Sequence, residues 1–448
     1  MKAALEEFNI KKTLWYNERS SGSPGSFSRI RSWRFWLLLS LLLSTLLVLL
    51  LLSRPYLPNP FLLFSRPSSN LGSGDQPGDW ATYGKNPGHR RYVAQPATLK
   101  GKIRWVLDPS ESSDSSPAVK DGILYVGGDF KVTAAAVSNG KTLWTYRSTG
   151  PVHSSPAVAG DLLFLGLLDG RVIALNRFSG KLQWQFTTGN FIICSPVIAD
   201  GFLHIGSSDG KIYTLDAKNG ALIWKVQTDG PIIHAPAVKD GIVYAVSNTK
   251  KLHSLDAKTG AKRLEYYLTQ NAVDAPAVTA AAVYTVPEGG RLIALKPEAR
   301  QYPWSHPLKV AWIQLWMMKF PLPTPTPQPG TLWGTFTKDK KGNFVSAPAV
   351  AGERIFAGDD RGRFYALKAL TGRAEWVIET GEVIATAPLI VGKTVYFGTK
   401  AGSLFGINLS DGNPQCKFPL GHPLKGELVF ASGLLLARSE SGLLIAVE

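Results

Sequence analysis

A motif that recurs every 40 residues constrains the fold of this chain more than any other feature of its sequence. Each copy opens with a proline, and neighbouring copies start 39 or 40 residues apart except across one interruption. Self-similarity at such a fixed period is typical of repeat architectures. The opening residues are Pro117, Pro156, Pro196, Pro236, Pro276, Pro348 and Pro388.

Each repeat contains four short apolar runs separated by turns. In residues 156–184 the runs are PAV, LLFLG, RVIAL and a fourth that contains Trp184, and Gly and Asp punctuate them. Runs of this kind, rich in Val, Ile, Leu and aromatic residues, predict β-strands joined by tight turns. Four antiparallel strands in about 40 residues match one blade of a β-propeller. We therefore predict an all-β propeller with four-stranded blades over residues 80–448.

The count of repeats predicts eight blades. Seven repeats are complete, whereas the eighth, which begins at Glu427, has only three strands before the chain ends. The missing strand is expected in KIRWVLD, because Trp105 precedes Pro117 by the same 12 residues that separate Trp184 from Pro196. An N-terminal strand that closes the last blade leaves no long exposed sheet edge. The alternative is a seven-bladed ring with the last repeat packed outside it.

The turn-and-tryptophan phrases of the repeats resemble those of pyrroloquinoline-quinone-type (quinoprotein-like) propellers. Examples are ALNRFSGKLQW (174–184) and TLDAKNGALIW (214–224), and the entry phrase DWATYGKNPGHRRYV (79–93) is also similar. The resemblance implies that an outer-strand aromatic docks between adjacent blades. It assigns this role to Trp105, Trp144, Trp184, Trp224 and Trp376. Leu264 and Phe336 stand where the family has Trp, so weaker seams are expected there.

The catalytic features of the quinoprotein dehydrogenases are not found in the sequence. Those enzymes typically use adjacent cysteines, a calcium ion held by carboxylate and amide groups, and a catalytic Asp. The only cysteines here, Cys194 and Cys416, are not adjacent, and no motif matches a calcium-ligand set. Compact zinc motifs, phosphate-binding loops and nucleophile elbows are also absent. We therefore expect no enzyme activity, no catalytic residue, and neither pyrroloquinoline quinone nor calcium as a cofactor.

A set of polar or small residues stands two positions before each repeat-opening proline. In a propeller such equivalent positions form a ring around the central channel. Three members on successive blades, Cys194, His234 and Asp274, could form a nucleophile set or a metal site. The alternative is that the side chains cap strand ends or face channel water. The ring comprises Ser115, Ser154, Cys194, His234, Asp274, Ser346 and Thr386.

The N-terminal part of the chain predicts a single-pass membrane anchor. Residues 35–52 contain no charge and suffice to cross a bilayer core as a helix. Residues 1–34 carry seven Lys and Arg, which predicts a cytoplasmic tail and an extracytoplasmic propeller on the cell membrane. A cleaved secretory signal is the alternative, although no small-residue cleavage pattern follows. Residues 53–79, rich in Pro, Ser and Gly, read as a tether, in which residues 61–64 contact either the membrane surface or the propeller.

The net charge of +16 is compatible with several partners. A basic surface suits anionic lipids, acidic envelope polymers or an acidic protein. Specific nucleic-acid binding is not expected, because no basic helix or recognition motif is present.

An insertion at about residues 296–335 interrupts the fifth repeat. It contains a stretch with helical spacing, 306–320, followed by a proline-rich spacer. Its large apolar residues are a candidate partner-binding surface, because such residues are enriched at adaptable interfaces. A lid on the propeller and a membrane-surface contact are the alternatives. The candidate residues are Trp312, Trp316, Met317, Met318 and Phe320.

Together these features predict a membrane-anchored propeller that serves as a protein- or ligand-binding and assembly platform in the cell envelope. A lipoprotein that assists outer-membrane protein assembly is the nearest analogy within the resemblance. The alternatives are a membrane-bound quinoprotein-type oxidoreductase and an envelope ligand sensor that signals through residues 1–34.

Overall fold

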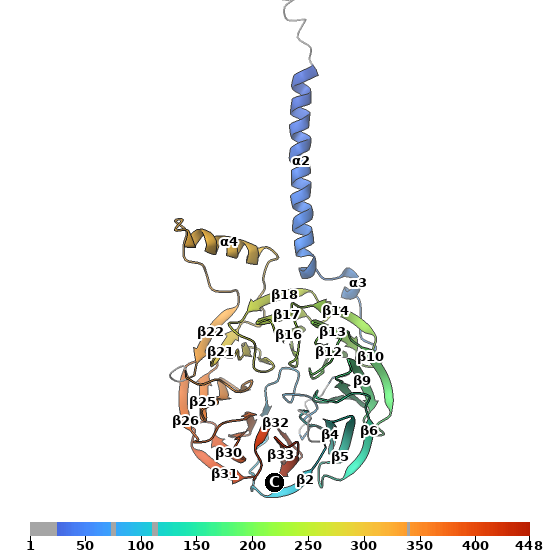
Figure 1. Ribbon diagram of the computed structural model, residues 1–448, viewed down its shortest axis with the longest axis vertical. Helices are drawn as coiled ribbons and strands as arrows, with labels where there is room; N and C mark the ends of the chain where they lie inside the picture. The colour runs from blue at the N-terminus through green and yellow to red at the C-terminus, as the bar shows by residue number, and fades with distance from the viewer. Residues whose placement is uncertain (1–24, 73–77, 110–114, 338–340) are drawn as a thin grey trace, which may run out of the picture. The chain divides into compact units, whose positions relative to one another are not determined.

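The computed structural model describes residues 25–72, 78–109, 115–337 and 341–448. Most of the predicted cytoplasmic tail, residues 1–34, lies outside these ranges. Residues 56–301 and 315–448 form one compact unit, and the helical residues 25–55 and 302–314 fall outside it. The compact unit is a ring of eight β-sheets arranged around a central channel (Figure 1).

Each of the first four blades is an antiparallel sheet whose strands follow chain order from the inner to the outer edge. Their strands are β3 (Ala118–Lys120), β4 (Ile123–Gly128), β5 (Lys131–Ala136) and β6 (Thr142–Arg147) in blade 1; β7 (Ala157–Ala159), β8 (Leu162–Gly166), β9 (Arg171–Asn176) and β10 (Leu182–Thr187) in blade 2; β11 (Val197–Ala199), β12 (Phe202–Gly206), β13 (Lys211–Asp216) and β14 (Leu222–Gln227) in blade 3; and β15 (Ala237–Lys239), β16 (Ile242–Ser247), β17 (Lys251–Asp256) and β18 (Lys262–Tyr267) in blade 4.

The remaining blades keep the same order, and two of them gain short additional strands. Their strands are β19 (Ala277–Val278), β20 (Val283–Thr285), β21 (Arg291–Leu295) and β22 (Thr331–Phe336) in blade 5; β23 (Ala349–Ala351), β24 (Arg354–Gly358), β25 (Arg363–Lys368) and β26 (Ala374–Glu379) in blade 6; β28 (Leu389–Val391), β29 (Thr394–Gly398), β30 (Ser403–Asn408) and β31 (Pro414–Pro419), with β1 (Tyr92–Val93), in blade 7; and β32 (Leu424–Ala431), β33 (Leu434–Ser439), β34 (Leu444–Val447) and β2 (Ile103–Leu107), with β27 (Thr386–Ala387), in blade 8.

The N-terminal strand closes the ring, as the repeat count predicts. Strand β2 is the outer strand of blade 8 and pairs antiparallel with β34, the last strand of the chain. The register places Leu107 opposite Leu444. This pairing confirms eight blades and rules out the seven-bladed alternative. Closure also removes the open edge that a three-stranded last blade would expose.

Tryptophans from the outer strands hold neighbouring blades together. The Trp184 indole of blade 2 donates a hydrogen bond from Nε1 to the Ala217 carbonyl of blade 3, at 3.2 Å. Its ring covers Gly220, where an added Cβ would lie 2.6 Å from the indole. Gly220 also has a φ of +75°, which glycine adopts most readily. The same contact recurs at six seams, where Trp105, Trp144, Trp184, Trp224, Trp333 and Trp376 cover Gly140, Gly180, Gly220, Gly260, Gly372 and Gly412.

The expectation that Phe336 occupies this position in blade 5 was wrong. Trp333 pairs with Ala294 just as Trp184 pairs with Ala174, and its Nε1 donates to the Ala369 carbonyl at 2.9 Å. Fifteen residues, rather than 12, separate Trp333 from Pro348, so the spacing pointed to the wrong aromatic. Leu264 does replace Trp in blade 4, and it is buried. Cys416 takes the equivalent position in blade 7.

The structure forms three α-helices over the described residues. These are α2 (Gly25–Ser53), the short α3 (Pro60–Leu63) and α4 (Ser305–Met317) within the insertion, and a 3-10 turn, η1 (Arg54–Tyr56), follows α2. The predicted anchor, residues 35–52, lies within α2. Over the described residues no single helix meets the length and apolarity of a membrane span. A pair bent by 44°, Trp36–Leu51 with Arg54–Leu63, meets them by length and composition.

Candidate functional site

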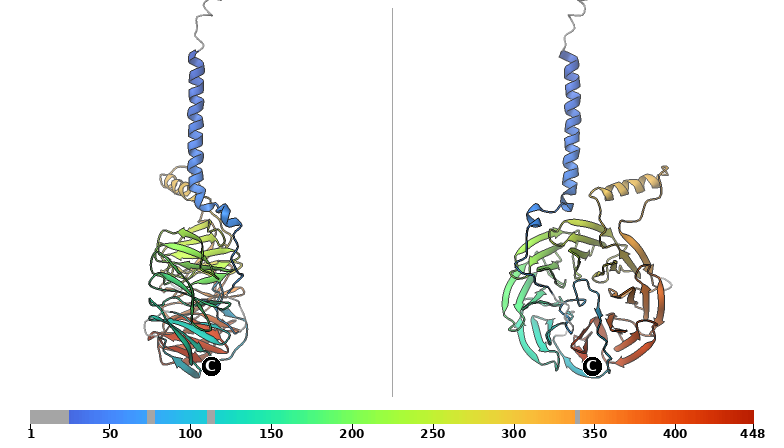
Figure 2. Two further views of the ribbon diagram at one scale, coloured as in Figure 1. Left: turned by 90° about the vertical axis from the view of Figure 1, so that its right-hand side faces the viewer. Right: turned by 180° about the vertical axis from the view of Figure 1, so that it is seen from behind.

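The N-terminal segment 78–93 runs through the middle of the ring. Figure 1 shows this blue segment crossing the centre, and the rear view in Figure 2 shows the same path. Its backbone bonds to inner strands or their turns in seven blades. Trp80 and Val119 exchange backbone hydrogen bonds. The other bonds run from the amides of Val158, Val238, Val278, Val350, Ile390, Gly392 and Ser432 to the carbonyls of Ala81, Pro87, Gly88, Arg90, Arg91, Val93 and Gly78 respectively. This axial segment (residues 78–93) therefore fills the middle of the ring and links seven blades through backbone hydrogen bonds.

A buried cluster of charges fixes the axial segment to the channel wall. The fully buried Arg91 guanidinium lies 3.3 Å from Glu427 Oε1 and 3.5 Å from Asp274 Oδ2. Glu427 also accepts a hydrogen bond from the Gly84 amide at 2.8 Å, and Asp274 accepts one from the Tyr83 hydroxyl at 2.7 Å. The Arg91 guanidinium thus forms ion pairs with two carboxylates that come from different blades of the ring.

The pKa values of the two carboxyls shift in opposite directions, although burial opposes the ionisation of both and Arg91 favours it. Burial raises the pKa of Glu427 to about 7, opposed by Arg91 and reinforced by Asp274. Burial also opposes ionisation of Asp274, but Arg91 and the hydrogen bonds to the carboxylate outweigh it and lower the pKa of Asp274. Like charges close together rarely both ionise in a buried site. The side chains of Arg91 and Glu427 are almost fully buried and that of Asp274 is 16% exposed, so the cluster links the axial segment to the inner wall of the ring.

The predicted ring residues mostly brace their own blades. Ser154 Oγ accepts from the Gly166 amide at 2.8 Å, 12 residues later in the same blade. The same bond joins Ser115 to Gly127 and Cys194 to Gly206. Thr386 of β27, which pairs with blade 8, accepts the equivalent bond from the Gly398 amide of blade 7. Ser346 Oγ instead donates to the Ala347 carbonyl at 3.3 Å. These contacts correspond to the strand-capping alternative.

The structure does not assemble Cys194, His234 and Asp274 into one site. Cys194 Sγ lies 3.2 Å from the His234 backbone carbonyl, and His234 Nε2 faces the Ala272 carbonyl at 3.1 Å. Asp274 turns instead to Tyr83 and Arg91. Burial raises the pKa of the Cys194 thiol to about 12, so the thiolate that a nucleophile needs is not formed near neutral pH. No group of three or more His, Cys, Asp or Glu suited to a metal occurs among the described residues.

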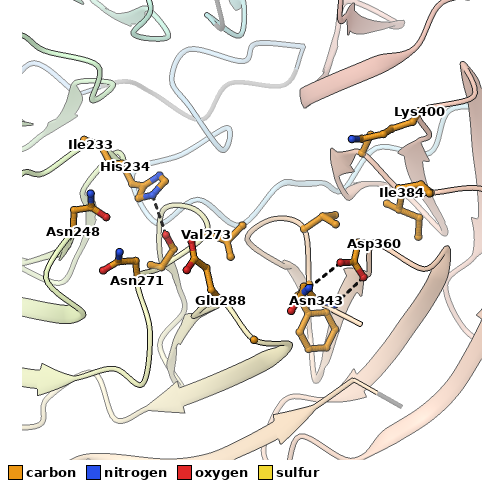
Figure 3. Close-up of a pocket in the computed structure, with 16 residues that line it drawn as sticks. Ile233, His234, Asn248, Asn271, Val273, Glu288, Asn343, Asp360, Ile384 and Lys400 are labelled. Atoms are coloured by element: carbon orange, nitrogen blue, oxygen red, sulfur yellow. Dashed lines mark hydrogen bonds between the residues drawn. The ribbon is translucent and has the colours of Figure 1, made fainter. Parts of the chain in front are cut away.

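A cavity of about 730 Å³ is lined by residues from the loops of blades 4, 5, 6 and 7. Figure 3 shows His234, Asn248 and Glu288 on one side of it and Lys400 with Ile384 on the other. Between them, the Asn343 backbone amide and side-chain amide both donate to Asp360, each at 2.9 Å. The lining of the cavity combines apolar side chains with amide and charged groups, a composition typical of binding sites.

The donor set of this cavity fits the quinone cofactor of the dehydrogenases poorly. Pyrroloquinoline quinone carries three carboxylates, whereas the lining offers one cation, Lys400, against the carboxylates of Glu288 and Asp360. Calcium prefers six to eight oxygen ligands. Asp360 already accepts two hydrogen bonds from Asn343. We derive no chemical step through either group.

The insertion presents large apolar side chains at the end of α4. Met317 and Met318 are each 71% exposed, and Trp316 and Phe320 are also exposed. Trp312 is only half-buried. Four of the five predicted partner-binding residues are thus open to solvent in the structure.

Several residues of the channel were not singled out by the sequence analysis. Arg91, Tyr83 and Glu427 meet across the axis although Glu427 lies 336 residues from Arg91 in the chain. The signal that pointed to them was the entry phrase 79–93, which contains both Tyr83 and Arg91. The rim residues Glu288 and Lys400 occupy ordinary turn positions and carry no local signal.

Comparison with known proteins places the chain among quinoprotein-like propellers. A family model described as outer membrane protein assembly factor BamB matches residues 91–230, 208–311 and 332–448. The dehydrogenase subunit of a quinone alcohol dehydrogenase from Komagataeibacter europaeus is 27% identical over 125 residues, 24% of this chain and 17% of that protein. A quinoprotein ethanol dehydrogenase from Pseudomonas putida is 36% identical over 74 residues, 14% of this chain and 12% of that protein. The matches thus span a small part of these relatives.

Solved structures of the same fold cover much more of the chain. BamB from Moraxella catarrhalis superposes with a TM-score of 0.61 at 16% identity, covering 79% of this chain and 98% of that one. A quinohemoprotein alcohol dehydrogenase from Comamonas testosteroni gives a TM-score of 0.65 at 14% identity, covering 88% and 82%. At these identities the likeness shows the propeller fold alone.

Proposed function

The chain belongs to the family described as outer membrane protein assembly factor BamB, and we propose that it is a membrane-anchored propeller that binds a protein partner in the cell envelope. The ring then serves as a rigid scaffold that binds a partner and catalyses no reaction. The fold itself does not decide the function, because propellers of this kind host enzymes and binding proteins alike. The main support for partner binding is the exposed apolar surface of the insertion.

The exposed apolar end of the insertion supports a docking role. Trp316, Met317, Met318 and Phe320 lie within five consecutive residues and are all exposed. Large side chains of these types carry much of the binding energy at protein interfaces. A lid would bury the same side chains against the propeller. Their exposure therefore supports the docking interpretation.

Two measurements on one variant, its melting temperature and its capture of a partner protein, distinguish a docking surface from a lid. Replacing Trp316 and Met318 by Ala in the full chain should abolish capture of a partner from crosslinked membranes. Loss of an interface anchor of this kind costs about 2 kcal/mol or more of binding free energy. Stability should change by less than about 0.5 kcal/mol, as for other surface substitutions.

The control variant is Leu370→Ala, which removes an equally exposed apolar side chain from blade 6. It should leave both capture and melting unchanged. A lid predicts instead a loss of roughly 2–5 kcal/mol in stability for each truncated side chain. Such a loss with capture intact would end the docking interpretation.

The proposed anchor is the apolar stretch of α2. Residues 36–51 contain no charged side chain, and the cations of residues 1–34 favour a cytoplasmic N-terminus. A reporter fused after Glu448 should be active only outside the cytoplasm. Cytoplasmic activity would contradict the topology, and a mature N-terminus beyond Leu52 would show cleavage of the segment.

The second candidate is a membrane-bound quinoprotein-type oxidoreductase. The similarity to quinone-dependent alcohol dehydrogenases and the cavity on the channel favour it. The poor fit of the lining to a tricarboxylate quinone and calcium opposes it. Purified full chain supplied with pyrroloquinoline quinone and calcium should neither bind the quinone stoichiometrically nor reduce a dye with alcohols. Robust turnover would favour this second candidate over the binding platform.

A further inference from the structure

The segment that leads from α2 into the ring is fastened to the outside of the propeller. The Ser68 amide and hydroxyl both donate to the Asp216 carboxylate of blade 3, at 2.6 and 2.8 Å. The Gly201 amide of the same blade donates to the Leu71 carbonyl at 2.7 Å. Lys258 of blade 4 donates from Nζ to the Leu63 carbonyl. Leu63, Ser68 and Leu71 thus bond to the propeller rim, within the stretch 53–79 whose composition predicts a tether.

The short helix α3 divides its side chains between the rim and solvent. Asn59 caps the helix by accepting a hydrogen bond from the Phe61 amide at 3.1 Å, and Pro60 occupies its first turn. Leu62 packs against a hydrophobic cluster that blades 2, 3 and 4 form together. Phe61 and Phe64 point the other way and are 86% and 87% exposed. Leu62 therefore contacts the propeller, whereas Phe61 and Phe64 leave their side chains free to contact a membrane surface.

We propose that Phe61 and Phe64 insert into the surface of an anionic lipid bilayer, so that the rim of blades 3 and 4 rests on the membrane. This inference rests on the proposed membrane anchor. Exposed phenylalanines beside cations are characteristic of segments that lie in the membrane interface. Arg66 supplies such a cation, because it is exposed and has no ion-pair partner among the described residues. Leu57 and Leu63 extend the exposed apolar surface.

Chain connectivity limits how far this surface can lie from the bilayer. Phe61 follows Ser53, the last residue of α2, by eight residues. An extended chain spans at most ~3.6 Å per residue, so Phe61 lies within about 29 Å of the end of the apolar helix. The side chains therefore lie within reach of the headgroup region whatever the direction of α2. A lipid surface is the occupant that this connectivity favours over a protein.

Photo-crosslinking from single positions of the full chain tests the contact. Benzoyl-phenylalanine is placed at Phe61 or Phe64, at Leu46 within α2, and at two remote exposed positions, Phe130 of blade 1 and Leu370 of blade 6. Each variant is reconstituted in vesicles of phosphatidylethanolamine and phosphatidylglycerol and irradiated. Lipid adducts are then measured by mass spectrometry. We expect adducts from positions 61, 64 and 46, and only background from 130 and 370.

The remaining outcomes separate this inference from the anchor. Adducts from 46 without adducts from 61 and 64 overturn the surface contact and leave the anchor standing. Background at 46 overturns the anchor, and the surface contact with it. Protein adducts in place of lipid adducts at 61 and 64, seen in membranes from cells, overturn the lipid assignment. Equal lipid adducts at 130 and 370 also overturn it, because the contact is then not specific to this rim.

Discussion

At the scale of single residues, the seams between blades leave no room for a side chain on the turn glycines. A Cβ on Gly220 would lie 2.6 Å from the Trp184 indole, whereas one on Gly241 would meet nothing within 4 Å. Both glycines have a positive φ, of +75° and +71°. Comparing alanine variants at Gly220 and Gly241 therefore separates the free-energy cost of a positive φ from the cost of the clash with Trp184.

We predict that Gly220→Ala destabilises the full chain more than Gly241→Ala does. The left-handed conformation costs roughly 1–2 kcal/mol for a residue with a Cβ, which applies to both. Displacing the indole adds about 1–3 kcal/mol at Gly220 alone. Denaturant unfolding in detergent measures the difference. Equal losses in the two variants would mean that the indole does not hold the seam.

The buried Glu427 makes a second residue-scale prediction. The folded chain holds the proton of this carboxyl until about pH 7, because its pKa is raised from 4.5. The unfolded chain binds fewer protons between these values, so stability falls as pH rises from about 4.5 to 7. The shift corresponds to roughly 3 kcal/mol.

The variant Glu427→Gln should remove this part of the pH dependence. Unfolding free energies of the wild type and the variant, measured from pH 4 to 8, should therefore diverge in slope between pH 4.5 and 7. Glu288→Gln, an exposed change at the channel rim, serves as the control and should parallel the wild type. Parallel profiles for all three proteins would refute the raised pKa of Glu427.

At the scale of elements, blade 8 depends on a strand from the other end of the chain. Strand β2 pairs with β34, and its Trp105 donates to the Val137 carbonyl of blade 1 at 2.7 Å. Deleting residues 101–108 should leave β34 as an open edge and lower the cooperativity of unfolding. Val106→Ala, on the exposed side of β2, should have little effect. Unchanged cooperative melting of the deletion variant would show that β2 is not needed for closure.

The elements also show which parts of the structure a sequence can predict. The 40-residue period predicts blades, their order and the closing strand, because each blade repeats the same strands and turns. It fails at Trp333, because the loop before Pro348 is three residues longer than in the other repeats. It also misses the axial segment, whose bonds run to blades all around the ring and follow no period. The Arg91, Asp274 and Glu427 cluster exists only after the ring has closed.

At the scale of the whole molecule, the ring is fastened along its axis and at its rim. The axial segment bonds to seven blades, and residues 56–72 follow the outside of blades 3 and 4. The insertion in blade 5 adds a second exposed apolar surface, which is suited to a partner.

The central claim is that the exposed end of the insertion binds a protein partner, and in-cell photo-crosslinking tests it most directly. Benzoyl-phenylalanine at position 316 of the full chain is compared with the same group at Phe130, an exposed position on blade 1. We expect a discrete protein adduct from position 316 that is lost when Met317 and Met318 are replaced by Asp. No adduct from position 316, or the same adduct from position 130, would contradict it.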